Sequence, residues 1–167
     1  MPPIIKYRIS LSFFLVGLVL SGVTAFPLAC ETRLLADGLG ISTSSPADTH
    51  SGLSFWISTV DRGLHETYAV YPWIAYGTDW LGFAHIASAV YFIGPLTNPV
   101  KNEWVIYAGL IGCLLVPPLA LICGPLRGIP FYWRLIDCSF GIFGAVPLLY
   151  CLYLTRIMKT YAERAKG

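Results

Sequence analysis

Two opposite charges, Arg134 and Asp137, stand three residues apart near the start of a long apolar run that begins at Phe131. In a helix, side chains at this spacing lie on nearly the same face and can pair. A carboxylate in the first turns of a helix is also favoured by the helix dipole. Ionisable residues within an apolar span are costly and tend to mark function. Two interpretations follow: a pair that only neutralises itself, or a site in which Arg134 holds an anionic ligand.

A second group of ionisable residues stands around another apolar run, Trp80 to Leu96. Asp79 and His85 would reach about the depth of Arg134 if both runs start at the same membrane face. They are six residues apart, which places them about 120° out of register around a helix and disfavours one shared ligand atom. His85 alone is also typical of a hydrogen-bonded core histidine. The candidate ligand-binding residues are Asp79, His85, Arg127, Arg134 and Asp137.

A third group, Asp61, His65 and Glu66, offers a weak metal-binding pattern. The i, i+4 spacing of Asp61 and His65 can hold a metal ion, but no third ligand follows at a set spacing. A solvated polar face of a helix explains the same residues and is the favoured interpretation. The chain has no C-x-x-C, G-x-S-x-G or H-E-x-x-H motif and no phosphate-binding glycine loop. Neither a cofactor nor a catalytic residue is therefore predicted.

The elements that must position these residues follow from the composition. Hydrophobic residues make up 56% of the chain and charged residues 12%. Soluble domains have about 45–50% apolar and about 25% charged residues. The composition therefore predicts an integral membrane protein. The net charge of +2 over 167 residues is too small to favour a nucleic-acid partner.

Four apolar runs are long enough to cross a bilayer, which needs about 20 residues. We expect an all-α fold, an integral membrane four-helix bundle, in a single membrane domain over residues 1–167. The first run also fits a signal peptide, because Val23 and Ala25 form a small-residue cleavage pattern, but a retained helix is favoured. The expected spans are about 10–29, 79–96, 104–124 and 131–154, with a loop over 30–78 and a basic tail over 155–167.

The basic residues that flank the runs predict the sidedness, because Lys and Arg are enriched in cytoplasmic flanks. With an even number of crossings, seven of them fall on one side: Lys6, Arg8, Lys101, Arg156, Lys159, Arg164 and Lys166. We therefore expect a multi-pass protein of the cell (inner) membrane with both termini in the cytoplasm and the loop exported. Arg127 and Arg134 would then lie at the outer face, beside an interfacial aromatic cluster that begins at Phe131.

The expected loop has two parts. Residues 38–52 are rich in Gly, Ser and Thr, which is typical of an irregular connector. Over 53–68, apolar residues recur at three- and four-residue spacing and predict an amphipathic interfacial helix, on the membrane surface or over the bundle. The apolar stripe of this helix is Leu53, Trp56, Ile57, Val60, Leu64 and Tyr68.

The chain has five cysteines, an odd count without a paired spacing, which disfavours a zinc or redox motif. Three of them, Cys30, Cys123 and Cys138, fall near the expected outer face, where a disulfide is chemically permitted. Free cysteines that behave as small hydrophobic residues are the favoured interpretation.

Three classes of function fit these observations. The favoured one is a small non-enzymatic binding or accessory protein with a polar cluster in the outer half of the bundle. Its partners would be membrane lipids, a larger membrane complex or a homo-oligomer. The alternative is a membrane-embedded enzyme acting on a lipid or isoprenoid-like substrate, with His85 or Asp79 as acid or base and an arginine on an anionic head group. The third, an oligomeric transporter or channel, is disfavoured because four helices leave little room for a pathway.

Overall fold

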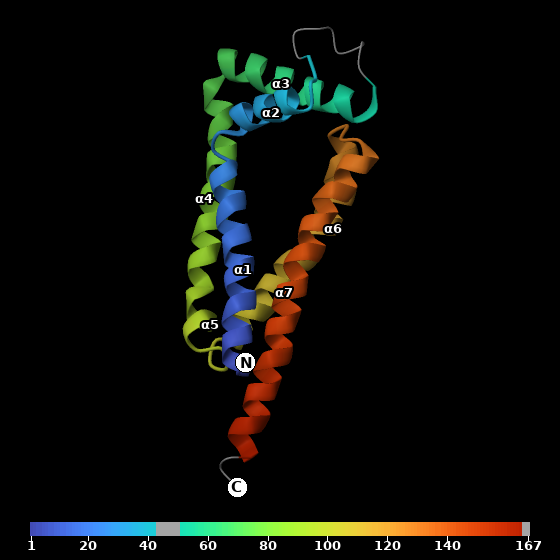
Figure 1. Cartoon of the computed structure of the whole chain (residues 1–167). Helices are drawn as coiled ribbons and strands as arrows, with labels where there is room; N and C mark the ends of the chain where they lie inside the picture. The colour runs from blue at the N-terminus through green and yellow to red at the C-terminus, as the bar shows by residue number, and fades with distance from the viewer. Residues whose placement is uncertain (43–50, 165–167) are drawn as a thin grey trace. The chain divides into compact units, whose positions relative to one another are not determined.

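The computed structural model of this chain describes residues 1–42 and 51–164 (Figure 1). All regular structure in the described part is helical, which confirms the expected all-α class. The helices are α1 Pro3–Thr24, α2 Leu28–Gly38, α3 Gly52–Val70, the 3-10 helix η2 Pro72–Ile74, α4 Ala75–Tyr91, α5 Ile93–Thr97, α6 Glu103–Leu126 and α7 Phe131–Arg164. They form two compact units, one of Met1–Leu18 with Ser88–Gly167 and one of Val19–Ala87.

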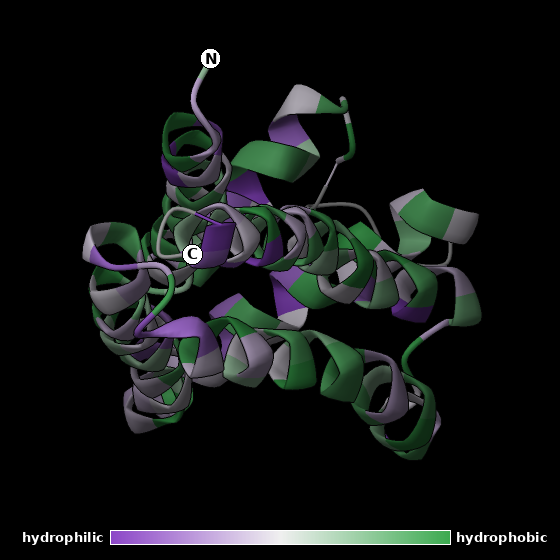
Figure 2. Ribbon diagram, turned by 90° about the horizontal axis from the view of Figure 1, so that it is seen from below, coloured by the Kyte–Doolittle hydropathy of each residue, from purple (hydrophilic) through white to green (hydrophobic). Residues whose placement is uncertain are grey.

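Four helical segments are long and apolar enough to cross a membrane, and Figure 2 shows hydrophobic residues along the long helices. The chain is therefore a membrane protein with four candidate spans, as its composition predicts. The segments are Pro3–Thr24, Pro72–Thr97, Glu103–Leu126 and Phe131–Arg164. The last of them, at about 51 Å, is longer than the hydrocarbon core of about 30 Å. The extra length lies at the C-terminal end, because α7 continues to Arg164 through most of the basic tail expected over 155–167.

The first span differs from its expected bounds of about 10–29. Helix α1 begins at Pro3, because proline is well suited to the first turn of a helix. It ends at Thr24, since Pro27 cannot continue the hydrogen-bond ladder. A separate helix, α2, begins directly afterwards in what was expected to be loop. The connector expected over 38–52 falls mostly on residues 43–50, outside the described residues.

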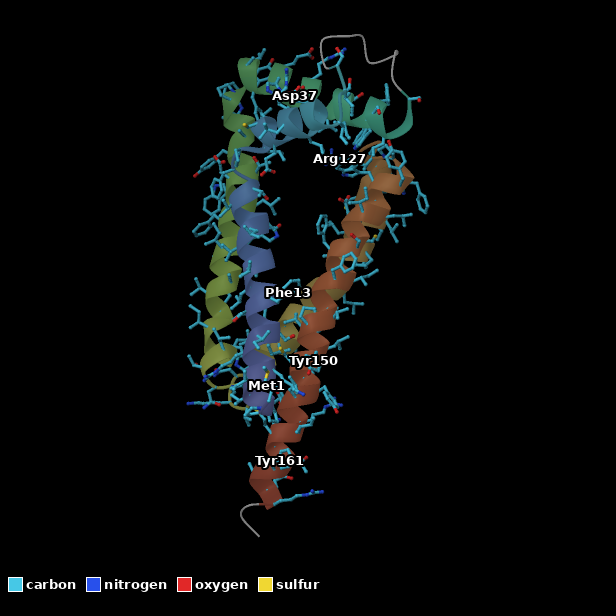
Figure 3. All side chains as sticks on the ribbon, viewed as in Figure 1. Met1, Phe13, Asp37, Arg127, Tyr150 and Tyr161 are labelled. Atoms are coloured by element: carbon cyan, nitrogen blue, oxygen red, sulfur yellow. The ribbon has the colours of Figure 1, made fainter. Side chains whose placement is uncertain are left out.

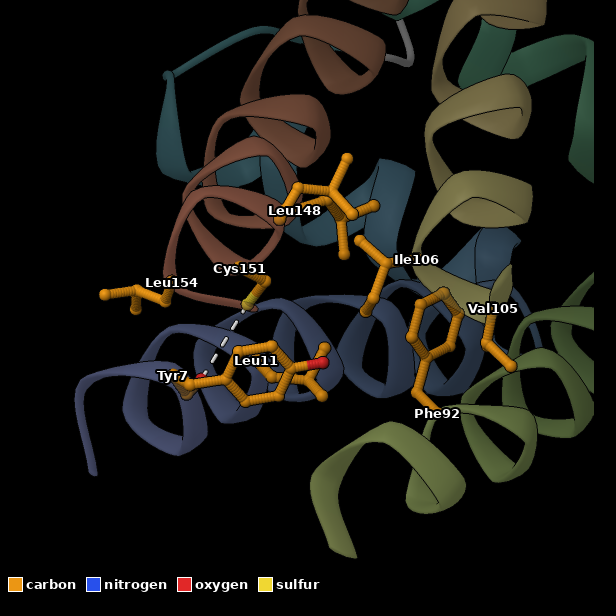
Figure 4. Packing of buried hydrophobic residues seen from close by; sticks show 9 residues of the cluster. Tyr7, Leu11, Phe92, Val105, Ile106, Leu148, Cys151 and Leu154 are labelled. Atoms are coloured by element: carbon orange, nitrogen blue, oxygen red, sulfur yellow. Dashed lines mark hydrogen bonds between the residues drawn. The ribbon is translucent and has the colours of Figure 1, made fainter. Parts of the chain in front are cut away.

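In the first unit, α6 and α7 pack side by side and share a hydrophobic core with the first half of α1 (Figures 1 and 4). The core includes Tyr7, Leu11, Phe92, Ile106, Leu148 and Cys151. Polar contacts add to this packing, because Ser10 Oγ donates to the Pro147 carbonyl at 3.1 Å and Cys151 Sγ lies 3.7 Å from the Tyr7 carbonyl. Helix α1 is thereby fixed on α7.

The turn between α6 and α7 shows why the apolar run breaks at Leu126. Gly128 has a positive φ of 70° and its N–H donates to the Pro125 carbonyl at 3.1 Å. The Ile129 N–H donates to the Gly124 carbonyl at 3.0 Å. These are the two hydrogen bonds of a Schellman motif, which satisfies the last carbonyls of α6. The chain can then reverse, and α7 starts at Phe131 after Pro130.

In the second unit, α2 and α3 pack side by side, and the end of α1 meets α4 (Figure 1). The α1–α4 crossing is made by Gly22 and Gly82, whose backbones approach closely. A Cβ on Gly82 would stand 2.6 Å from the Gly22 carbonyl oxygen, and one on Gly22 would stand 2.8 Å from the Gly82 carbonyl oxygen. Small residues allow such close helix contacts within membranes.

All five cysteines are free thiols in the structure, including Cys30, Cys123 and Cys138. Cys138 and Cys151 are buried, as expected for cysteines that act as small hydrophobic residues.

Candidate functional site

Among the described residues, a cluster of polar side chains in mutual contact lies between α2 and α3. The C-terminal end of α2 helps to position it. Gly40, with a φ of 67°, donates its N–H to the Asp37 carbonyl at 3.1 Å, and the Ile41 N–H donates to the Ala36 carbonyl at 2.9 Å. This is a second Schellman motif. It folds Ile41 back over Ala36, and both pack on Ile57 of α3. Figure 3 labels Asp37 near this end of α2.

Asp61 is the centre of this site, because its side chain is fully buried (0% exposed) on the face of α3 that meets α2. Arg33 Nε donates to Asp61 Oδ1 at 3.2 Å, and Arg33 Nη2 lies 2.9 Å from Oδ2. The contact between Nη2 and Oδ2 is not aligned as a hydrogen bond, so only the attraction between the opposite charges acts on Oδ2. Thr32 Oγ1 adds a contact of 3.3 Å to Oδ1.

The ion pair of Arg33 with Asp61, called the Arg33–Asp61 fork below, links α2 to α3. A buried carboxylate without a partner would lose several kcal/mol of hydration, and the planar guanidinium is the side chain best shaped to compensate for it. The Arg33 side chain is 43% exposed, so its charge stays partly hydrated while Asp61 is fully enclosed. The fork therefore fixes α2 on α3 at little cost to the arginine.

His65 lies one turn after Asp61, at the edge of the same site. Its Nδ1 is 2.8 Å from the Asp61 backbone carbonyl and 3.3 Å from Asp61 Oδ1. A carbonyl can only accept, so Nδ1 carries a proton and Nε2 is the ring nitrogen that points away from this contact. The His65 side chain is 41% exposed.

The structure corrects the expectation that Asp61 belongs to a solvated polar face. Asp61 is buried because α2, which was not expected, covers this side of α3. Glu66 is exposed, in line with a solvated face, but it does not join Asp61 and His65. In residues 1–42 and 51–164 there is no group of three or more His, Cys, Asp or Glu side chains that could hold a metal ion. The Asp61 carboxylate is instead occupied by Arg33.

The ion pair expected between Arg134 and Asp137 is not formed. The stem of Arg134 lies against Gly124 of α6, and its guanidinium carbon is 5.2 Å from the centre of the Phe131 ring. Long side chains in a helix lean toward its N-terminus, which carries the Arg134 guanidinium to Phe131 and away from Asp137. Within the described residues, no carboxylate lies within ion-pairing distance of Arg134. Its Nε is buried without a hydrogen-bond partner there.

The other candidate residues are distributed over both units. Asp79 and His85 are half-buried on α4 in the unit Val19–Ala87, and His85 Nδ1 is 2.9 Å from the Leu81 carbonyl of its own helix. Arg127 is exposed at the turn between α6 and α7, in the other unit (Figure 3). The convergence of all five candidate residues therefore stays a prediction.

The comparisons with known proteins add no assignment, because no protein family, curated protein or solved structure matches this chain. The site residues that the sequence interpretation missed are Thr32 and Arg33. A signal for them was present: Pro27 ends one helix, and the Gly-Leu-Gly-Ile sequence from Gly38 is typical of a helix end. A helix between these two points places Thr32 and Arg33 in its middle.

Proposed function

We propose that this protein is a non-enzymatic binding or accessory protein of a larger membrane complex, and that the α2–α3 pair is its binding element. The observation that carries this proposal is the fork between Arg33 and the buried Asp61, which joins two helices outside the four candidate spans. Helices that are held together before a partner arrives lose little conformational entropy on binding. The pair is thus suited to recognition.

Exposed leucines on α2 support a protein partner. Leu35 in α2 and Leu39 at its C-cap are four residues apart, hence neighbours on one side of the helix, and Leu34 lies about 100° further around it. All three are exposed although they lie outside the candidate spans. Apolar side chains that gather on a surface outside the bilayer mark interaction sites. The side of α2 that carries Thr32, Arg33 and Ala36 packs against α3, and the leucines stay exposed beside this contact.

The proposal includes a topology in which both termini are cytoplasmic and the α2–α3 pair is exported, as the flanking basic residues indicate. In a variant whose native cysteines are replaced by serine, a cysteine introduced by Asp37→Cys should react with a membrane-impermeant maleimide in intact cells. A cysteine introduced by Lys101→Cys should react only after permeabilisation. Both positions are exposed, so accessibility within the protein does not limit the reaction. The opposite labelling pattern would refute the topology.

A membrane enzyme is the second candidate, because the Asp61 carboxylate lies 3.3 Å from His65 Nδ1, and a carboxylate beside an imidazole is one part of many nucleophile–base sites. Ser58 is buried on the same helix face, and its Oγ has no hydrogen-bond partner within the described residues. Ser58 and His65 are seven positions apart in the helix, a rise of about 10 Å, whereas a base must lie within about 3 Å of its nucleophile. The binding function therefore has the stronger support.

Photocross-linking tests the proposed function. A photoreactive amino acid at Leu35, in cells that express the full chain, should capture one protein of constant mass. The same amino acid at Leu115, an exposed position of α6 within a candidate span, is the control and should capture lipid. Capture of lipid alone from Leu35 would place α2 on the bilayer surface and contradict a protein partner.

A further inference from the structure

A groove of about 510 Å³ lies between α3 and the start of α4, within the unit Val19–Ala87. It is separate from the Asp61 site. On α3 it is lined by residues at helical spacing, among them Val60, Gly63, Leu64 and Thr67, and across from them by Ile74 and Gly77. Its lining is mostly apolar. The groove is open to the surface along its length rather than an enclosed pocket.

The position of the groove along the chain indicates what fills it. Ile74 and Gly77 belong to the first turns of the candidate span Pro72–Thr97. Exposed aromatic residues surround this helix start, with Tyr76 and Trp80 in edge contact at 5.9 Å and Trp80 and Phe83 at 5.6 Å. Such aromatic belts mark the depth at which lipid head groups give way to acyl chains. The aromatic residues indicate the depth of this helix start, and Ile74, which lines the groove on another side of the helix, is itself exposed at that depth.

The chemistry of the lining favours an acyl chain over an extended peptide. A peptide backbone in an apolar groove needs hydrogen-bond partners for its N–H and C=O groups. The lining offers few, and the hydroxyl of Thr78 already donates to the Ala75 carbonyl at 2.8 Å. A hydrocarbon chain has no polar groups and needs no such partners.

Two glycines leave the groove open. A Cβ on either Gly63 or Gly77 would meet no heavy atom within 4 Å, and neither residue has a positive φ. A side chain can therefore be added at either position of the groove lining without a contact at its Cβ and without backbone strain.

We propose that this groove binds one acyl chain of a membrane phospholipid, which lies between α3 and the first turns of α4. The site goes beyond the proposed function, because it lies on a different face of α3 from the one that meets α2. It would anchor α3, a helix outside the candidate spans, to the bilayer through a lipid rather than through a span of its own.

The test uses the purified full chain in phosphatidylcholine vesicles that contain a phosphatidylcholine with a diazirine on one acyl chain. After irradiation, peptide mass spectrometry should find adducts on α3 between Val60 and Thr67 in the wild type. Gly63→Leu and Gly77→Leu should each lower these adducts about tenfold, because the leucine occupies the site of the chain. Gly112→Leu on α6, where a Cβ also meets open space, is the matched control and should leave them unchanged.

Adducts on α3 that are equal in the wild type and both groove variants would overturn the proposal. So would adducts that occur only on α4 and α6, since the acyl chains would then touch the spans alone. A photoreactive amino acid at Thr67 that cross-links two copies of the chain would make a second protomer the occupant and would also overturn it. Because the vesicles contain only lipid and this protein, a negative result in this experiment does not bear on the protein partner proposed for α2.

Discussion

Replacing Arg33 with methionine is expected to release α2 from α3. The change keeps most of the apolar stem but leaves the fully buried carboxylate of Asp61 without its cation. Breaking a buried ion pair on one side costs about 3–5 kcal/mol. We expect about 2–3 kcal/mol here, because the exposed part of Arg33 is already screened by water. That loss corresponds to roughly 100-fold faster amide exchange over Thr32 to Ala36, measured by hydrogen–deuterium exchange.

The matched control is the double variant Arg33→Met with Asp61→Leu, in which neither charge remains. Replacing a buried ion pair by apolar residues of similar size is often neutral or stabilising. The double variant should therefore recover most of the protection that the single variant loses. Equal exchange in the wild type and Arg33→Met would show that the α2–α3 contact does not depend on the fork.

Gly82→Ala is expected to destabilise the crossing of α1 and α4. The added Cβ would stand 2.6 Å from the Gly22 carbonyl oxygen and 2.7 Å from Cε2 of Phe26. A backbone oxygen cannot move aside like a flexible side chain, so the helices must separate. Overpacking of this kind costs about 1–3 kcal/mol. We expect a lower midpoint of thermal unfolding in detergent for this variant.

Gly77→Ala serves as the control for the crossing, since it lies on the same helix and its Cβ would meet open space. Alanine favours helix over glycine by about 1 kcal/mol, so Gly77→Ala should be neutral or raise the midpoint. If Gly82→Ala has the same effect as Gly77→Ala, the close approach of the two backbones does not contribute to stability.

The four candidate spans and the helix α3 could be predicted from the sequence because long apolar runs and three- and four-residue spacing are local signals. Helix α2 was missed because the apolar run that contains α1 continues past Pro27 to Ala29 and hides the break. The burial of Asp61 then could not be foreseen, since it depends on contacts from residues about 30 positions away. In sequence, a buried Asp at i with His at i+4 looks the same as a solvated pair.

The three-residue spacing of Arg134 and Asp137 shows a second limit of prediction from the sequence. Residues three apart share a helix face, and that part of the prediction follows from helix geometry. The direction of the Arg134 side chain depends on Gly124 of the neighbouring helix, where a Cβ would overlap its stem. Tertiary packing therefore decided which contact formed.

The most direct measurement for the proposed function is cross-linking from Leu35 in three forms of the chain: the wild type, Arg33→Met, and the double variant Arg33→Met with Asp61→Leu. If the α2–α3 pair binds a partner as an ordered surface, Arg33→Met should lose the captured protein and the double variant should regain it. If Asp61 and His65 instead perform chemistry, the double variant should keep α2 ordered by hydrogen exchange yet fail to replace the wild-type chain in cells. Recovery of both capture and cellular function is the result that we expect. A double variant with an ordered α2 that does not regain the captured protein would contradict the proposal.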